Sequence, residues 1–198
     1  MNTGLYSSDQ AIWDAFQQGD REAYALLYQQ YADTLYKYGR RITTDVPLVE
    51  DCIQDLFIDL WRTHASLSRP DSIRFYLYKV LRRKLMKAMA KVNYVLDERV
   101  LLDEARMELV LPREMELIAE QSTQELLDKL RHEFNNLTPR QKEALILRFY
   151  DNLSYNEIAE LLSISYQSVN NLIHRSIIAL RVAFSVKLIL VFITRFTA

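Results

Sequence analysis

Residues 138–181 read TPRQKEALILRFYDNLSYNEIAELLSISYQSVNNLIHRSIIALR, and this stretch decides the fold of the C-terminal part of the chain. Thr138 is followed by a proline and, three positions on, by Gln141, a pattern typical of a capped helix start. Ser154 and Glu157 repeat the capping spacing. We therefore predict two capped helices, separated by a turn at residues 151–152.

A third helix is predicted after the short connection 163–165, with Ser165 as its cap. One of its faces is mainly apolar, with the helical spacing of Val169, Ile173, Ser176 and Leu180. The opposite face is polar and carries Gln167, Asn170, Asn171, His174, Arg175 and Arg181. No acid occurs from Ser165 to Leu180, as expected of a helix that approaches phosphates and base edges. The segment predicts a DNA-binding helix-turn-helix, with an αα-hairpin inside a bundle as the alternative.

Composition favours an all-α protein, because only three glycines and four prolines occur among 198 residues that are 49% hydrophobic. The single cysteine, Cys52, excludes an internal disulfide framework and multi-cysteine zinc sites, and its place on an apolar helix face predicts burial. The first residues, MNTGLYSSDQ, lack the basic and apolar regions of a signal peptide. We therefore expect a cytoplasmic protein.

Charge is segregated along the chain, although the total is only −1. Residues 1–92 carry a net +2, residues 93–128 a net −7 and residues 129–198 a net +4. We predict two helical domains at 1–92 and 123–184, joined by an acidic linker at 93–122. The last segment, 185–198, is a hydrophobic tail that is too short between its charges to span a membrane. We expect it to pack on a domain or to dock a partner protein.

The first 92 residues contain three predicted helices, and each of them has a distinctive face. The first, at 21–41, has an aromatic-rich stripe that is typical of a core. The second begins near Pro47, and its outward face carries Glu50, Asp51, Gln54, Asp55, Ile58, Trp61 and Arg62. An acidic face that exposes apolar side chains favours a protein interface over plain solvation.

The third predicted helix, at 72–91, combines cations with aromatic side chains. Its packed side is formed by Leu77, Leu81, Leu85 and Ala88. The other side carries Phe75, Tyr76, Lys79, Arg82, Arg83, Met86, Lys87 and Lys91. Such a surface suits single-stranded or locally opened nucleic acid, because bases stack on rings while cations follow the backbone. A basic solvated face would give the same spacing.

Three runs together resemble the extracytoplasmic-function (ECF) group of sigma-70-like factors, which have only regions 2 and 4. They are WDAFQQGDREAYALLYQQYADTLYKYGRRI, VEDCIQDLFIDLW and the 138–181 stretch quoted above. The resemblance covers about residues 10–92 and 123–181. It implies a region 2 helical bundle and a region 4 helix-turn-helix, and a protein that directs promoter-specific transcription initiation.

The resemblance also implies partners and site residues. Core RNA polymerase, through its β′ clamp helices and its β subunit, would bind Asp51, Gln54, Asp55, Ile58 and Trp61. The promoter −10 element would meet Phe75, Tyr76, Lys79, Arg82, Arg83 and Lys87. The −35 element would meet Gln167, Ser168, Asn170, Asn171, His174 and Arg175. An anti-sigma factor is a further expected partner, and the factor is expected to act as a monomer.

Some residues depart from the usual pattern of that group. Arg83 and Lys87 stand where many members carry Asn and Asp, and Asn170 and Asn171 stand where Lys or Arg are common. Asn can read adenine edges but adds little affinity for phosphate. We therefore predict weak DNA binding by the free protein, with useful affinity once polymerase holds both domains.

Two other function classes account for less of the sequence. A one-component helix-turn-helix regulator would bind a palindrome as a dimer without polymerase, but it leaves the acidic face and the basic-aromatic helix without a role. An enzyme is disfavoured because the three histidines lie in separate segments and no glycine-rich phosphate loop occurs. We expect no cofactor, no metal site and no small-molecule substrate.

Overall fold

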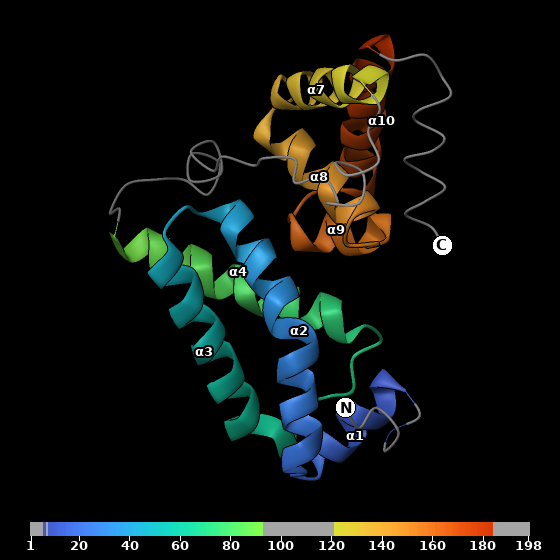
Figure 1. The fold of residues 1–198 in the computed structure, drawn as a ribbon. Coiled ribbons are helices and arrows are strands. Elements are labelled where there is room, and N and C mark those ends of the chain that lie inside the picture. Colours follow the sequence, from blue (N-terminus) through green and yellow to red (C-terminus); the bar gives the residue numbers. More distant parts are fainter. Residues whose placement is uncertain (1–5, 7, 93–120, 184–198) are drawn as a thin grey trace. The chain divides into compact units, whose positions relative to one another are not determined.

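The computed structural model describes residue 6 and residues 8–92 and 121–183. Throughout these residues the regular structure is helical, without a strand, so the predicted all-α class is confirmed. The chain divides into two units, Met1–Ala105 and Arg106–Ala198, and each is treated below by itself. Figure 1 shows the helices of both units.

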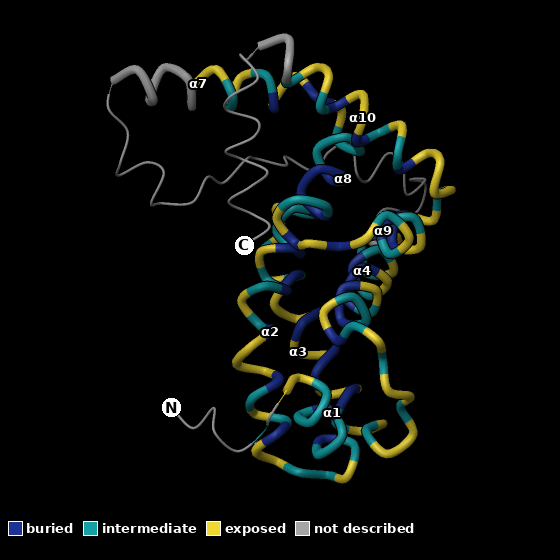
Figure 2. Tube along the Cα trace, turned by 90° about the vertical axis from the view of Figure 1, so that its right-hand side faces the viewer, coloured by how far each residue is buried: buried dark blue, intermediate teal, exposed yellow. Residues whose placement is uncertain are grey.

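In the first unit, the residues that the structure describes form four α-helices and one short 3-10 turn. The bounds are Asp9–Gln17 for α1, Arg21–Ile42 for α2, Val46–Thr63 for α3, His64–Ser66 for η1 and Ile73–Val92 for α4. Helices α2, α3 and α4 pack against one another, and α1 packs mainly on α2. Buried positions line the inner sides of these helices, as Figure 2 shows, so a single apolar core holds the unit together.

Two of these helices begin where the sequence indicates. The carboxylate of Asp20 caps α2 by accepting from the backbone N–H of Glu22 at 2.8 Å. Asp45 caps α3 by accepting from Leu48 N–H at 3.1 Å, so this helix begins one residue before Pro47. Both caps satisfy backbone donors that would otherwise lack partners at a helix start.

Helix α1 is not among the helices predicted from the sequence. Ser8 caps it by accepting from Ala11 N–H at 3.2 Å, and Gly19 follows it with a φ of +86°. A serine before and a glycine after an apolar spacing of Trp13 and Phe16 are the signals that could have found it. Both aromatic side chains are fully buried, so α1 is an integral part of the core.

Within the second unit, the described residues form α7 (Gln121–Asn135), α8 (Pro139–Phe149), α9 (Tyr155–Leu161) and α10 (Tyr166–Ala183). Helix α10 packs on the other three. Capping boxes are present at Thr138–Gln141 and at Ser154–Glu157, as predicted. Ser165 caps α10 by accepting from Ser168 N–H at 3.1 Å. The predicted helix-turn-helix is therefore confirmed, with turns at Asn152 and Ser163, both of positive φ.

The predicted acidic linker and hydrophobic tail, at 93–122 and 185–198, lie almost wholly outside the described residues. Within the helices that are described, none is long and apolar enough to cross a membrane.

Candidate nucleic-acid interface and protein-docking face

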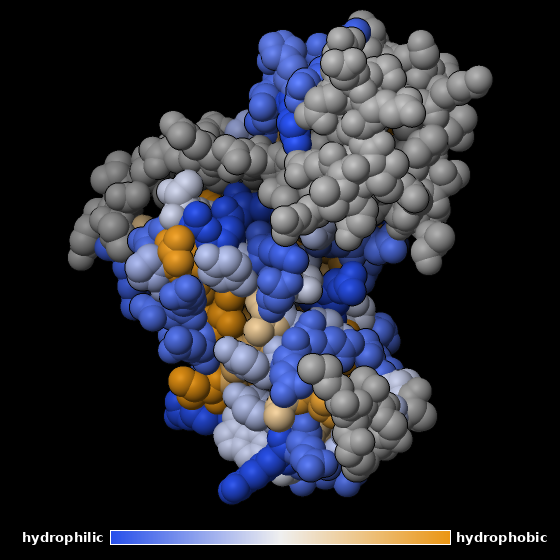
Figure 3. All heavy atoms as spheres, viewed as in Figure 1, coloured by the Kyte–Doolittle hydropathy of each residue, from blue (hydrophilic) through white to orange (hydrophobic). Residues whose placement is uncertain are grey.

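Helix α3 presents an acidic-apolar face to solvent. Asp51, Gln54, Asp55 and Ile58 are all exposed at helical spacing, while Cys52, Leu56 and other apolar residues turn into the core. Ile58 is 53% exposed, which is unusual for a large aliphatic side chain on a well-packed helix. Figure 3 shows hydrophobic residues at the surface among hydrophilic ones over α2 and α3. The arrangement fits a docking face for a protein.

Trp61 lies at the end of this face and is only partly exposed. Its ring packs on Tyr24 of α2, with centroids 5.0 Å apart, and stacks on His64 at 5.2 Å. Tyr28 of α2 is 45% exposed and packs edge-on against Phe57 at 4.8 Å. Tyr28 thus adds an exposed ring next to α3, although it belongs to the aromatic stripe of 21–41 that the sequence predicts to be core.

Helix α4 carries a stripe of exposed cations. Lys79, Arg83 and Lys87 lie four residues apart and are exposed, and the half-buried Phe75 continues the same line toward the start of the helix. The ammonium group of Lys79 lies 5.7 Å from the centroid of the Phe75 ring. This stripe combines a ring with three positive charges, the combination that binds single-stranded nucleic acid.

Tyr76 lies beside this stripe and is anchored to α1. Its ring packs edge-on against Trp13, with centroids 5.5 Å apart. Burial raises the pKa of the Tyr76 hydroxyl, and the positive charges of Arg83 and Lys79 partly oppose the shift. Tyr76 therefore stays neutral near pH 7, and the position of its ring depends on α1.

Arg82 corrects the predicted face of α4. Helical spacing predicts it among the exposed cations, but Arg82 is only 5% exposed. Its guanidinium donates to the hydroxyl of Tyr38 on α2 at 3.2 Å, and Tyr38 itself stacks on Tyr78 with centroids 4.3 Å apart. The long side chain turns inward because α2 offers a hydrogen-bond acceptor opposite it, which helical periodicity cannot show. Arg82 belongs to the interior of the unit.

Helix α10 has the polar face that the sequence predicts. Gln167, Ser168, Asn171, His174 and Arg175 are exposed and Asn170 is partly exposed, while Val169, Ile173 and Ser176 are buried. The amide of Gln167 donates to Asn171 at 3.4 Å. Ser176 is satisfied in the interior, because its hydroxyl donates to the carbonyl of Leu172 at 2.7 Å. The exposed face therefore offers amide, hydroxyl and cationic groups together.

Two tyrosines beside this face were not expected from the sequence. Tyr166, the first residue of α10, is 50% exposed and packs edge-on against Tyr155 of α9 at 5.7 Å. The guanidinium of Arg148 lies 5.4 Å from the centroid of the Tyr155 ring. The two tyrosines enlarge the surface at the start of α10.

The chain combines a helix-turn-helix whose second helix has no acidic residue with another helix that carries cations and aromatic rings. This combination is typical of a DNA-binding protein that acts in transcription. Comparison with known families agrees. The family model described as sigma-70 region 2 matches residues 27–93, and the model described as sigma-70, region 4 matches residues 127–180. The chain belongs to the sigma-70 family of RNA polymerase sigma factors, in its extracytoplasmic-function group.

Individual relatives give the same picture. The chain is 28% identical over 162 residues to the RNA polymerase sigma factor YlaC of Bacillus subtilis, covering 81% of this chain and 91% of that protein. It is 26% identical over 172 residues to the ECF RNA polymerase sigma factor SigW of the same organism, with 82% and 89% covered.

A solved structure shares the fold. The sigma factor RpoE of Bartonella quintana, in complex with the anti-sigma factor NepR, gives a TM-score of 0.52 at 18% identity. The match covers 79% of this chain and 92% of that one.

Proposed function

We propose that this sigma factor binds core RNA polymerase through the exposed face of α3 and contacts promoter DNA through α4 and α10. The observation that carries the proposal is the division of chemistry between two neighbouring helices of one unit. Helix α3 exposes carboxylates around Ile58, whereas α4 exposes Lys79, Arg83 and Lys87. Surfaces of opposite charge suit different partners, a protein for α3 and DNA for α4.

The polymerase-binding residues in this proposal are Asp51, Gln54, Asp55 and Ile58, with Trp61 at the end of the face. The exposed aliphatic side chain supplies apolar contact area, and the carboxylates supply orientation toward a basic partner surface. Tyr28 extends the same face from α2, since it packs on Phe57 at 4.8 Å. The β′ clamp helices and the β subunit are the proposed partners within polymerase.

The −10 contacts are assigned to Phe75, Tyr76, Lys79, Arg83 and Lys87. The rings can stack on bases of the opened strand, and the three cations can follow its phosphates. Arg82 is omitted from this surface because its guanidinium is buried beside Tyr38.

The −35 contacts are assigned to Gln167, Ser168, Asn170, Asn171, His174 and Arg175. Helix-turn-helix proteins place this helix in the major groove, where amides can bond bidentately to adenine. Few of these residues are cationic, so most of the affinity must come from polymerase holding both units on one DNA.

An anti-sigma factor is the proposed regulator. An exposed apolar residue within an acidic face, together with exposed cations on α4, suits a protein that covers these surfaces before polymerase does. In the same proposal, residues 93–122 form a linker and residues 185–198 form a tail. The protein acts in the cytoplasm as a monomer and catalyses no reaction itself.

The test is co-purification with core polymerase, followed by transcription from a promoter that the wild-type holoenzyme uses. The double variant Asp51→Arg, Asp55→Arg reverses the charge of the α3 face and is expected to lose polymerase binding and transcription. Asp33→Arg is the matched control, since Asp33 is an exposed carboxylate on α2. Full activity of the double variant, with an unchanged melting temperature, would remove the proposed interface. A palindrome bound tightly by free dimer would favour the one-component regulator.

A further inference from the structure

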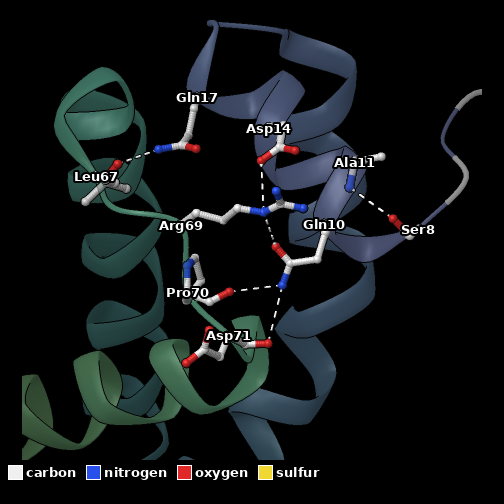
Figure 4. Close-up of polar contacts among 9 residues, drawn as sticks. All are labelled: Ser8, Gln10, Ala11, Asp14, Gln17, Leu67, Arg69, Pro70 and Asp71. Atoms are coloured by element: carbon white, nitrogen blue, oxygen red, sulfur yellow. Dashed lines mark hydrogen bonds and ion pairs between the residues drawn. The ribbon is translucent and has the colours of Figure 1, made fainter.

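The connection between η1 and α4 is held by side chains of α1, as Figure 4 shows. Gln10 donates to the carbonyl oxygens of Pro70 and Asp71, at 3.0 and 3.4 Å. Gln17 donates to the carbonyl of Leu67. Three backbone carbonyls within five residues of the connection therefore accept from amide groups of one helix, about 50 to 60 positions earlier in the chain.

Arg69 completes the same network from the side of the connection. Its Nε donates to Oε1 of Gln10 at 2.7 Å and lies 3.3 Å from a carboxylate oxygen of Asp14. Gln10 thus uses both ends of its amide, donating with Nε2 and accepting with Oε1. The amide has little freedom to rotate without losing one of these bonds.

The connection leads directly into the part of α4 assigned to promoter DNA. Ser72 caps α4 by accepting from Phe75 N–H at 3.2 Å, and its carbonyl accepts from Tyr76 N–H at 3.0 Å. Trp13, on the same helix as Gln10 and Gln17, packs against the Tyr76 ring. Helix α1 therefore contacts both the backbone that precedes α4 and one of the rings that α4 presents.

We infer that Gln10 and Gln17 are positioning residues for promoter opening: by fixing the 67–71 connection, they set how α4 presents Phe75 and Tyr76 to the opened strand. The inference rests on the proposed function of α4. Neither glutamine belongs to the α3 face or to the cationic stripe, so their effect reaches DNA only through the connection and the first turn of α4.

The hydrogen-bond network around Gln10 and Arg69 is better suited to orienting the 67–71 connection than to stabilising the folded unit. The side chains of Arg69 and Asp14 are 56% and 44% exposed, and exposed polar pairs contribute little to stability. The buried anchor of α1 is instead Trp13 with Phe16. Removing the glutamine amides should therefore leave the helix in place while releasing the connection.

The experiment uses the full chain with core polymerase. Wild-type holoenzyme first selects its preferred sequence from a duplex pool with a randomised promoter region, and that sequence is rebuilt as a fork-junction DNA opened over the −10 region. The variant Gln10→Ala, Gln17→Ala is then compared with Gln18→Ala, Gln29→Ala, which changes two exposed glutamines of the same unit. Affinity for core polymerase, affinity for the fork and melting temperature are measured for each.

We expect the Gln10, Gln17 variant to bind the fork about 5- to 150-fold more weakly, the range that corresponds to losing one stacked base. Its affinity for core polymerase should stay within about twofold of wild type, and the control should match wild type in both. The slope of log affinity against log salt should not change, since no phosphate contact is removed. Lys79→Ala, by contrast, should make that slope shallower.

Gln10→Glu separates the two ends of the amide. A glutamate keeps an acceptor for Arg69 but removes the donor that the Pro70 and Asp71 carbonyls use. Gln10→Glu should therefore lose as much affinity for the fork as Gln10→Ala. Wild-type fork binding by either the double variant or Gln10→Glu would overturn the inference, as would an equal loss of polymerase affinity. Failure of the wild-type holoenzyme to select any sequence would instead count against the proposed function.

Discussion

Gly39 of α2 lies so close to Val49 of α3 that a Cβ on the glycine would sit 2.6 Å from Cγ1 of the valine. Both residues are buried, and the close approach of the two helices depends on the missing side chain. Glycine within a helix normally costs about 0.5–1 kcal/mol relative to alanine, so its presence here reflects packing rather than helix propensity.

Gly39→Ala is therefore expected to destabilise the first unit by about 1–3 kcal/mol, against the usual direction for this substitution in a helix. The stiff, branched Val49 side chain cannot move aside easily. Urea unfolding measures the change. Adding Val49→Ala should recover part of the loss, and a Gly39→Ala protein as stable as wild type would show that α2 and α3 can separate freely.

The ion pair between α3 and α4 predicts a dependence of stability on pH. The ammonium of Lys84 donates to the Asp59 carboxylate at 2.6 Å, and this bond lowers the pKa of Asp59 below its ordinary 3.8. A carboxyl group whose pKa is lower when folded stabilises the protein above its unfolded pKa, and loses this effect as pH falls through the folded pKa.

Lys84→Met should thus reduce the free energy of unfolding at pH 7 by about 0.5–1 kcal/mol, a value kept small by the exposure of Asp59. The difference from wild type should shrink as pH falls below about 4. Lys37→Met removes a more exposed pair, with Asp33, and should cost less. A difference for Lys84→Met that persists undiminished at pH 2 would mean that lost packing, not the ion pair, is responsible.

Cys52 is expected to be chemically inert in the folded protein. It is 6% exposed, and burial raises the pKa of its thiol, with a further contribution from the Asp55 carboxylate. Because the thiolate is the reactive form, an aromatic disulfide reagent should react at least about 100-fold more slowly with native protein than with protein unfolded in urea. Equal rates would show that α3 opens readily.

Asn171 on α10 offers a test of base recognition. Asn171→Ala is expected to lose about 1–3 kcal/mol of discrimination at one position of the upstream element, with a smaller change on unrelated DNA. Binding of holoenzyme to single-base variants of the selected promoter measures this. Asn136→Ala, at an exposed asparagine that follows α7, is the control. A uniform loss across all sequences would assign Asn171 to the DNA backbone.

Free protein and holoenzyme should differ strongly in DNA affinity. The exposed face of α10 carries Arg175 as its one arginine within the described side chains, and few phosphates can be neutralised by it. A gel-shift assay at about 150 mM salt should therefore show specific binding only when core polymerase is present. Nanomolar binding by the free protein would contradict this expectation.

The sequence predicts the fold best where local chemistry is explicit. Thr138 with Gln141, and Ser154 with Glu157, define helix starts that the structure reproduces as complete capping boxes. Helix α1 was missed because a nine-residue helix gives little periodicity, and its role depends on Trp13 meeting α4 across the unit. Contacts of that kind join residues far apart in sequence, and no local pattern encodes them.

The difference between local patterns and distant contacts also explains why three of the predicted α4 cations are exposed and one is not. Lys79, Arg83 and Lys87 share a face by spacing alone, and they are exposed as predicted. Arg82 is also an arginine and is next to Arg83 in the sequence, but its side chain is buried, where it donates a hydrogen bond to Tyr38 of α2. Residue type and helical spacing therefore locate the exposed face of a helix. Contacts with the neighbouring helix determine which side chains of that face are buried instead.

The Arg82–Tyr38 pair has a consequence for the register of the helices. A guanidinium stays charged at any pH that the folded protein survives, so the interior between α2 and α4 contains a permanent positive charge. Sliding α4 by one turn would move that charge by about 5.4 Å, away from the Tyr38 hydroxyl. We therefore expect the pair to favour this alignment of the two helices over others that shape alone would allow.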